Sequence, residues 1–151
     1  MRSKSLVELK EITKDNIEEI LNLKVSKQQE GFVSSVAYSL AQAWVYKTAF
    51  PFAIYVDNNP VGFIMLGYYE ARKQYTLWKF LIDRQHQNKG YGRKALRLAV
   101  DYLIETFGVS EIFTGVALGN ETAKHLYTSF GFVATGIVED DMEEMRYICK
   151  I

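Results

Sequence analysis

The strongest constraint on the fold is a short segment, Gln87–Gly92, in which two glycines one residue apart join a strand-like apolar run, Leu77–Ile82, to a helical pattern that begins near Arg93. Glycine lets the backbone adopt a positive φ and approach an anion closely. A helix start adds unpaired NH groups and a partial positive charge at the same point. The segment therefore predicts a phosphate-binding turn. A tight strand-to-helix turn without a ligand is the alternative that the glycines alone leave open.

Hydrophobic periodicity predicts alternating strands and helices. Asp15 with Glu18 resembles a capping box that opens a first helix, Trp44 falls on the inward stripe of a second helix, and Pro51 is expected to end that helix. Turn residues at 57–60 predict an antiparallel hairpin. The result is an α/β sheet packed by helices. The expected strands are 6–12, 52–56, 61–69, 74–82, 111–117, 132–138 and 145–151, and the later helices are 34–48, 93–107 and 120–131.

The composition is that of a globular chain without a global electrostatic partner. Its 151 residues are 48% hydrophobic, and 18 basic and 18 acidic side chains give zero formal charge. We therefore expect one domain, residues 1–151, that binds neither nucleic acid nor a membrane surface. Cys149 is the only cysteine, which excludes an internal disulfide, fits a reducing compartment and predicts a packed thiol. With no apolar run long enough to span a membrane, we expect a cytoplasmic protein, and we expect no metal.

A second motif, Asn120–Phe132, reads Asn-Glu-Thr-Ala-Lys-His-Leu-Tyr-Thr-Ser-Phe-Gly-Phe. With Gln87-x-x-Gly90-x-Gly92 after a strand, it resembles the two main signatures of the Gcn5-related N-acetyltransferase (GNAT) superfamily, in that family's order and over essentially the whole chain. The resemblance implies the GNAT fold, an α/β (α+β) architecture with a mixed, mostly antiparallel central sheet flanked by helices. Homodimers are common in the family. Shorter matches resemble the bacterial spermine/spermidine (diamine) acetyltransferases: Asp15-Asn16, Ile20-Leu21-Asn22-Leu23, Val25-Ser26 and Pro60-Val61-Gly62-Phe63.

The resemblance implies acetyl-CoA as the cosubstrate. A diphosphate needs several convergent donors, so its expected partners are backbone NH groups. The side chains of Lys89, Arg93 and Lys94 are either additional phosphate contacts or a solvated basic face. In the family a backbone NH at the end of the preceding strand faces the thioester oxygen, which here places Leu81 or Ile82. The expected phosphate-binding residues are Gln87, Asn88, Lys89, Gly90, Tyr91, Gly92 and Arg93.

Tyr127 and Asn120 match the second signature, in which the family's tyrosine hydroxyl lies near the sulfur. A phenol with a reference pKa near 10 is a usable acid toward a thiolate near 8.5. Spacing alone also fits a plain core role, because Ala123, Leu126, Tyr127 and Phe130 form one apolar stripe. With the resemblance, we predict Tyr127 as the general acid. Asn120 is expected to cap the helix and to contact the ligand.

The acceptor side is less defined by sequence. In the family, two regions line the acceptor cleft, and here they supply Glu30, Tyr68, Tyr69 and Glu70, whose carboxylates and rings suit a polycation. The acidic run 139–144 ranks below them, since a solvated hairpin turn explains it.

The general base is open, because Trp78 stands where related enzymes often carry an acidic residue. Glu70, Asp83, Glu30 and a water are the candidates, whereas His86 and His125 are expected to face solvent. The sequence thus predicts an N-acetyltransferase that moves acetyl from acetyl-CoA to a primary amine, such as spermidine or spermine. Another amine (an amino acid, an aminoglycoside or a peptide N-terminus) and a noncatalytic acyl-CoA-binding regulatory domain are the alternatives.

Overall fold

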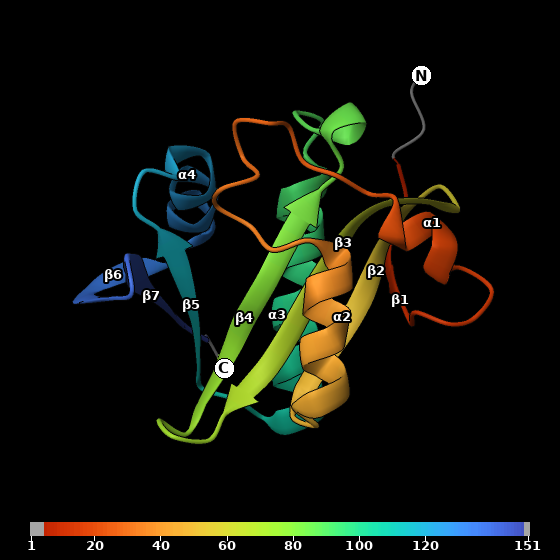
Figure 1. Ribbon diagram of the computed structural model, residues 1–151. Helices are drawn as coiled ribbons and strands as arrows, with labels where there is room; N and C mark the ends of the chain where they lie inside the picture. Colours follow the sequence, from red (N-terminus) through yellow and green to blue (C-terminus); the bar gives the residue numbers. More distant parts are fainter. Residues whose placement is uncertain (1–4, 150–151) are drawn as a thin grey trace.

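Seven strands form one sheet in the order β1-β2-β3-β4-β5-β7-β6 (Figure 1) in the computed structural model, which describes residues 5–149. Every neighbouring pair is antiparallel except β4 and β5, which are parallel. The structure confirms the mixed, mostly antiparallel sheet. The strands are β1 (Val7–Lys10), β2 (Ala49–Val56), β3 (Asn59–Tyr69), β4 (Gln74–Ile82), β5 (Glu111–Ala117), β6 (Val133–Glu139) and β7 (Met142–Ile148).

Helices cover both faces of this sheet (Figure 1). Residues on β3 show why, because side chains alternate between faces along a strand. Phe63 and Met65 pack with the first two helices, while Ile64 and Leu66 pack with the last two. None of the helices described has the length and apolar character needed to cross a bilayer. The helices are α1 (Ile17–Leu21), α2 (Val36–Val45), α3 (Tyr91–Phe107) and α4 (Glu121–Phe130), with a short 3-10 turn η1 (Arg84–His86) before α3.

Three local predictions were wrong. The N-cap of α1 is Asn16, whose Oδ1 accepts the Thr13 NH at 2.8 Å, so the capping box at Asp15 does not form. Trp44 is 77% exposed, because the inward stripe of α2 runs through Val36 and Ser39 and the helix ends one residue after Trp44. Pro51 lies inside β2 rather than at a helix end. The pairing of β1 with β2 reaches only Ala53, so one edge of β2 is unpaired at Pro51 and tolerates a residue without an NH.

The parallel strands β4 and β5 separate soon after they meet. They are in register only at two residue pairs, Thr76 with Phe113 and Leu77 with Thr114. At the next position the β3–β4 register skips Trp78, which makes Trp78 the extra residue of a bulge. A bulge bends and twists the strand that carries it. The bulge therefore accounts for the place where β4 turns away from β5, and it leaves an open fissure between the two strands.

Candidate active site

The fissure between β4 and β5 contains a cavity of about 320 Å³. Its walls come from both separated strands, from the start of α4 and from the segment before α2. Thr114 lies at its base, where the strands still pair. Sequence segments that are far apart thus meet here, among them the second signature motif through Asn120, Ala123 and Tyr127. The lining includes Phe32, Val33, Ser34, Trp78, Lys79, Phe80, Val116, Asn120, Ala123 and Tyr127.

At one end of the fissure, the segment Gln87–Arg93 forms the predicted turn into α3. Asn88 and Gly90 have positive φ values of 63° and 81°, and Gly90 is the residue that precedes the helix. Backbone NH groups at a helix start have no intrahelical acceptor. None of the backbone NH groups from Gln87 to Arg93 donates to an acceptor in residues 5–149. A ring of unsatisfied donors at a helix start fits an anionic diphosphate.

The two glycines of this turn have different roles. A Cβ on Gly90 would meet nothing within 4 Å, so its space is open, and its φ of 81° disfavours any other residue. Gly92 has no positive φ, and a Cβ there would lie 3.5 Å from the Leu126 side chain, an ordinary contact. We predicted that both glycines allow a phosphate to approach closely, and we now make that prediction for Gly90 alone. Gly92 lets α3 approach α4 and Phe80.

The side chains around the turn tie it to the rest of the site. The Gln87 Nε2 donates to the Ile82 carbonyl at 2.9 Å and to Gln29 Oε1 at 2.8 Å, which connects the turn to β4 and to the segment before α2. The Arg93 guanidinium donates to Ser129 Oγ at 3.0 Å on α4, so its side chain is directed at that helix. Lys89 and Lys94 are exposed. The backbone NH groups of the turn, rather than these basic side chains, are the donors left without an acceptor in residues 5–149.

Leu81 and Ile82 end β4 beside the fissure. They pair with Phe63 and Gly62 on β3, and no strand pairs with the opposite edge of β4 beyond Leu77 among the residues described. Backbone NH groups alternate between the two edges of a strand. One of these two residues therefore directs its NH toward β5, which is consistent with the predicted oxyanion donor.

Tyr127 enters the fissure from α4. It is 7% exposed, its ring contacts Phe80 and Phe132, and it belongs to both the hydrophobic core and the lining of the fissure. The core position of Tyr127 is thus confirmed, and its role as the general acid stays a prediction. Burial raises the pKa of the Tyr127 phenol to about 12, although a hydrogen bond with the Thr114 side chain acts to lower it. Such a phenol stays protonated at neutral pH and remains a hydrogen-bond donor.

Asn120 caps α4 as predicted. Its Oδ1 accepts the Ala123 NH at 3.4 Å, and its side chain also lines the fissure. The cap fixes the first turn of α4, and the helix then carries Tyr127 inward. His125, on the same helix, is exposed as expected.

A second cavity, of about 470 Å³, adjoins the fissure, and we call it the acceptor cavity. Trp78, Thr114, Gly115 and Met142 line both spaces, so the two lie side by side. The rest of its lining comes from the end of α2, the β3–β4 hairpin and the β6–β7 hairpin. That lining includes Gln42, Tyr46, Tyr68, Tyr69, Arg72, Gln74, Ile137, Glu139, Asp140 and Glu144.

The structure brings together only part of the predicted acceptor site. Tyr68 and Tyr69 line the acceptor cavity, but neither Glu30 nor Glu70 lines either space, and both are exposed in turns. The carboxylates in the cavity come instead from the acidic run at the β6–β7 hairpin. The sequence analysis ranked that run below Glu30 and Glu70 because a solvated hairpin turn explains it. Periodicity does not show which strand such a hairpin lies beside.

Two polar residues bear on the open question of the base. Asp83 is held away from this role, since its two carboxylate oxygens accept the NH groups of Lys24 at 2.9 Å and Gln85 at 3.3 Å. Lys79, which sequence reasoning missed, lines the fissure and donates to Ser34 Oγ at 2.8 Å. Burial lowers the pKa of Lys79. Its position next to Trp78 on a strand of the fissure was the signal that could have found it.

Comparison with known proteins agrees with this geometry. The model of the acetyltransferase (GNAT) family matches residues 17–132. The spermine/spermidine N(1)-acetyltransferase of Bacillus subtilis strain 168 is 31% identical over 145 residues, which cover 92% of this chain and 95% of that protein. A spermidine N(1)-acetyltransferase of Vibrio cholerae is 35% identical over 92 residues, covering 60% of this chain and 53% of that protein. The chain belongs to the GNAT family and is an acetyl-CoA-dependent N-acetyltransferase.

Solved structures show the same fold. The spermidine N-acetyltransferase from Vibrio cholerae in complex with CoA and spermine superimposes with a TM-score of 0.71 at 21% identity, over 93% of this chain and 92% of that one. A domain from Methanocaldococcus jannaschii superimposes with a TM-score of 0.78 at 15% identity, over 97% of this chain and all (100%) of that one. At such identities the likeness concerns the fold alone.

Proposed function

We propose that this protein acetylates a primary amine of a polyamine such as spermidine or spermine. The observation that carries the proposal is that two cavities with different chemistry lie side by side and share four lining residues. The fissure presents Asn120 and Tyr127, and the adjoining acceptor cavity presents aromatic rings and carboxylates. Cationic amines bind such walls through ion pairing and cation–π contacts. The Bacillus subtilis relative named for spermine and spermidine supports the same acceptor class.

For the cosubstrate, the residues present fit a CoA group. The donors at Gln87–Arg93 and the open space beside Gly90 suit its diphosphate, and the fissure between β4 and β5, which Tyr127 lines, would receive its thioester end. When bound, acetyl-CoA supplies the acetyl group as a thioester. The backbone NH of Leu81 or Ile82 would stabilise negative charge that develops on the thioester oxygen.

Tyr127 would act on the sulfur side. With a pKa of about 12, its proton is held more tightly than that of a thiol, whose reference value is about 8.5. We infer that the phenol first donates a hydrogen bond to the developing thiolate and that this bond is its main contribution to rate. The acceptor amine must lose a proton, because an alkylamine with a pKa near 10.4 is mostly charged at neutral pH. A water within the fissure is the base we favour, since Asp83 is engaged and Glu30 and Glu70 lie elsewhere.

The test is a CoA-release assay with a panel of amines: spermidine, spermine, a short monoamine, an amino acid, an aminoglycoside and a peptide with a free N-terminus. We expect the highest catalytic efficiency with the polyamines. Equal efficiencies for polyamines and the monoamine, or turnover only with the amino acid or peptide, would remove the polyamine assignment and keep the acetyltransferase. The cytoplasmic location, the homodimer and the single domain over residues 1–151 stay predictions.

A further inference from the structure

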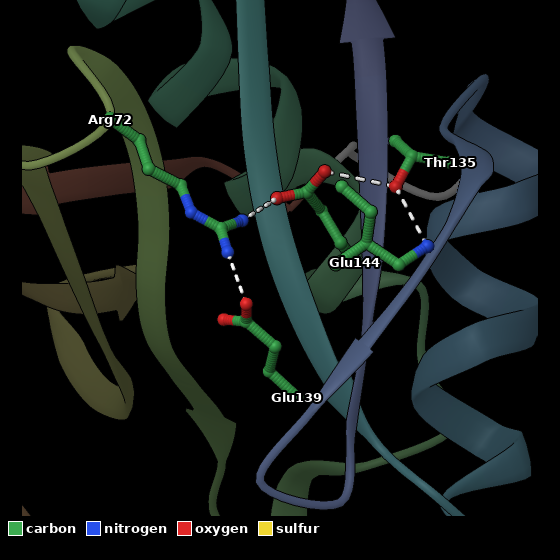
Figure 2. A network of polar contacts seen from close by, with 5 residues as sticks. Arg72, Thr135, Glu139 and Glu144 are labelled. Carbon is green, nitrogen blue, oxygen red and sulfur yellow. Dashed lines mark hydrogen bonds and ion pairs between the residues drawn. The ribbon is translucent and has the colours of Figure 1, made fainter.

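Arg72 connects two hairpins across the acceptor cavity (Figure 2). It lies in the turn between β3 and β4, and its guanidinium contacts Glu139 Oε1 at 2.5 Å and Glu144 Oε2 at 3.0 Å on the β6–β7 hairpin. All three residues line the cavity. A cationic group of this chain therefore already occupies an anionic position inside the space expected to receive a cationic acceptor.

Glu144 is the better defined of the two carboxylates. Its side chain is 13% exposed, against 65% for Glu139. Figure 2 shows how it is held: Thr135 Oγ1 donates to Glu144 Oε1 at 2.9 Å, while Arg72 takes the other oxygen. The Thr135 oxygen in turn accepts the Ile137 NH at 3.3 Å. A carboxylate so far withdrawn from water needs a cation, whereas an exposed pair contributes little.

The rest of the lining suits a cation that is not part of the chain. The lining contains three carboxylates, from Glu139, Asp140 and Glu144, and one guanidinium, so it stays negative even with Arg72 in place. The rings of Tyr46, Tyr68, Tyr69 and Trp78 add surfaces for cation–π contact. Gln42 Oε1 is buried in the same lining and has no hydrogen-bond partner among the described residues, which leaves an acceptor free for an ammonium donor.

We propose that Glu144, with Glu139 beside it, forms the subsite for the distal ammonium of the acceptor, and that Arg72 is an internal cation which a polyamine displaces. This inference rests on the proposed function and deepens it. The four residues shared by the two cavities connect this subsite to the fissure that holds Tyr127. A monoamine cannot compete with Arg72, because its one nitrogen must enter the fissure. Arg72 therefore acts as a selectivity element for acceptors with a second cation.

The experiment compares Glu144→Gln and Arg72→Ala with a matched control, Glu143→Gln. Glu143 is adjacent on β7, pairs with Lys124 at 3.1 Å and does not line the acceptor cavity. We expect Glu144→Gln to raise the KM for spermine about ten-fold, as loss of a charge-assisted contact predicts. Its kcat and its KM for a monoamine should stay near wild type. Arg72→Ala should lower the KM for spermine about three-fold or more, because the competing cation is gone.

The result that would overturn the inference is an Arg72→Ala protein whose KM rises for polyamine and monoamine alike and whose Tm falls, which identifies Arg72 as a structural clamp between the hairpins. An unchanged KM for spermine in Glu144→Gln would overturn it as well.

Calorimetric titration with spermine, without acetyl-CoA, separates the two proposals. If the wild type binds spermine and the Glu144→Gln variant binds it more weakly, the subsite is supported even if a different amine is the one acetylated. If the wild type and every variant acetylate polyamines equally well, the subsite is ruled out and the proposed function still stands.

Discussion

The Thr114 hydroxyl donates to the Leu77 carbonyl at 3.0 Å, at the last residue pair where β4 and β5 are in register. The bond closes the base of the fissure. Because Thr114 also lines both cavities and its side chain acts to lower the pKa of the Tyr127 phenol, one buried side chain links the separation of the strands to the proposed acid. The fissure's shape and the chemistry inside it therefore depend on the same residue.

Thr114→Val should destabilise the protein and lower its turnover rate. The substitution keeps the shape but removes the donor to Leu77, and an unsatisfied buried polar group costs roughly 1–3 kcal/mol. Urea unfolding followed by circular dichroism measures this loss. Thr114→Ser keeps the hydroxyl and serves as the control. A Thr114→Val protein as stable as wild type would show that the strands do not depend on this bond.

Tyr127→Phe should retain acetyl-CoA binding and lose turnover by about 100- to 10,000-fold, the range for a general acid. The ring that contacts Phe80 and Phe132 remains, so stability should change little. Tyr147→Phe is the control, because Tyr147 lines neither cavity and its hydroxyl only accepts from Arg97 at 3.3 Å. Stopped-flow turnover at saturating substrate provides the test: a rate near wild type would show that the Tyr127 hydroxyl gives the thiolate neither a hydrogen bond nor a proton.

The same tyrosine should make stability fall at high pH. Its pKa is raised from the ordinary 10 to about 12, so the folded state favours the protonated phenol. The stabilisation is complete below pH 10 and is lost as the pH rises through 12. One pKa unit corresponds to 1.36 kcal/mol, so the unfolding free energy should drop by roughly 2–3 kcal/mol across this window. In Tyr127→Phe the unfolding free energy should not show this part of the decrease. Parallel curves of unfolding free energy against pH for the two proteins would contradict the raised pKa of Tyr127.

Much of the fold follows from periodicity, and the misses have local causes. The predicted strands 74–82 and 111–117 match β4 and β5 to the residue, since each is an apolar run bounded by turn residues. Helix α3 begins at Tyr91, two residues before the expected start, because Gly90 rather than Gly92 is the residue of positive φ at its cap. The prediction that Pro51 ends a helix was wrong because a proline is tolerated on a strand whose edge is unpaired. Only the sheet order reveals that condition.

The site divides in the same way. The turn donors, Asn120 and Tyr127 belong to contiguous motifs, so their sequence predicts where they lie relative to their own helices. The acceptor cavity is made by hairpins distant in the chain, and the pairing of Arg72 with Glu139 and Glu144 spans that distance. No periodicity encodes such a meeting. Glu30 and Glu70 are carboxylates that lie outside the acceptor cavity, whereas Glu144 is a carboxylate that lines it.

The phosphate turn provides a test that separates ligand binding from backbone strain. Gly90→Ala should weaken acetyl-CoA binding, because Gly90 has a φ of 81° and lies in the turn before α3 whose NH groups have no acceptor in residues 5–149. A non-glycine residue in that conformation costs on the order of 1 kcal/mol, and the turn relieves it by moving its donors. A loss of affinity of about ten-fold or more is expected. Gly92→Ala, by contrast, should bind almost normally, since its Cβ finds an ordinary contact.

Gly136→Ala is the matched control for strain. Gly136 lies in β6 with a φ of 90°, and a Cβ there also meets nothing within 4 Å, so the backbone penalty is alike while the phosphate turn is untouched. Isothermal titration with acetyl-CoA and thermal unfolding should be measured on all three variants. We expect Gly90→Ala and Gly136→Ala to lose similar stability and only Gly90→Ala to lose affinity. Equal affinities in these two variants would assign Gly90 to the fold of the turn alone and place the diphosphate elsewhere.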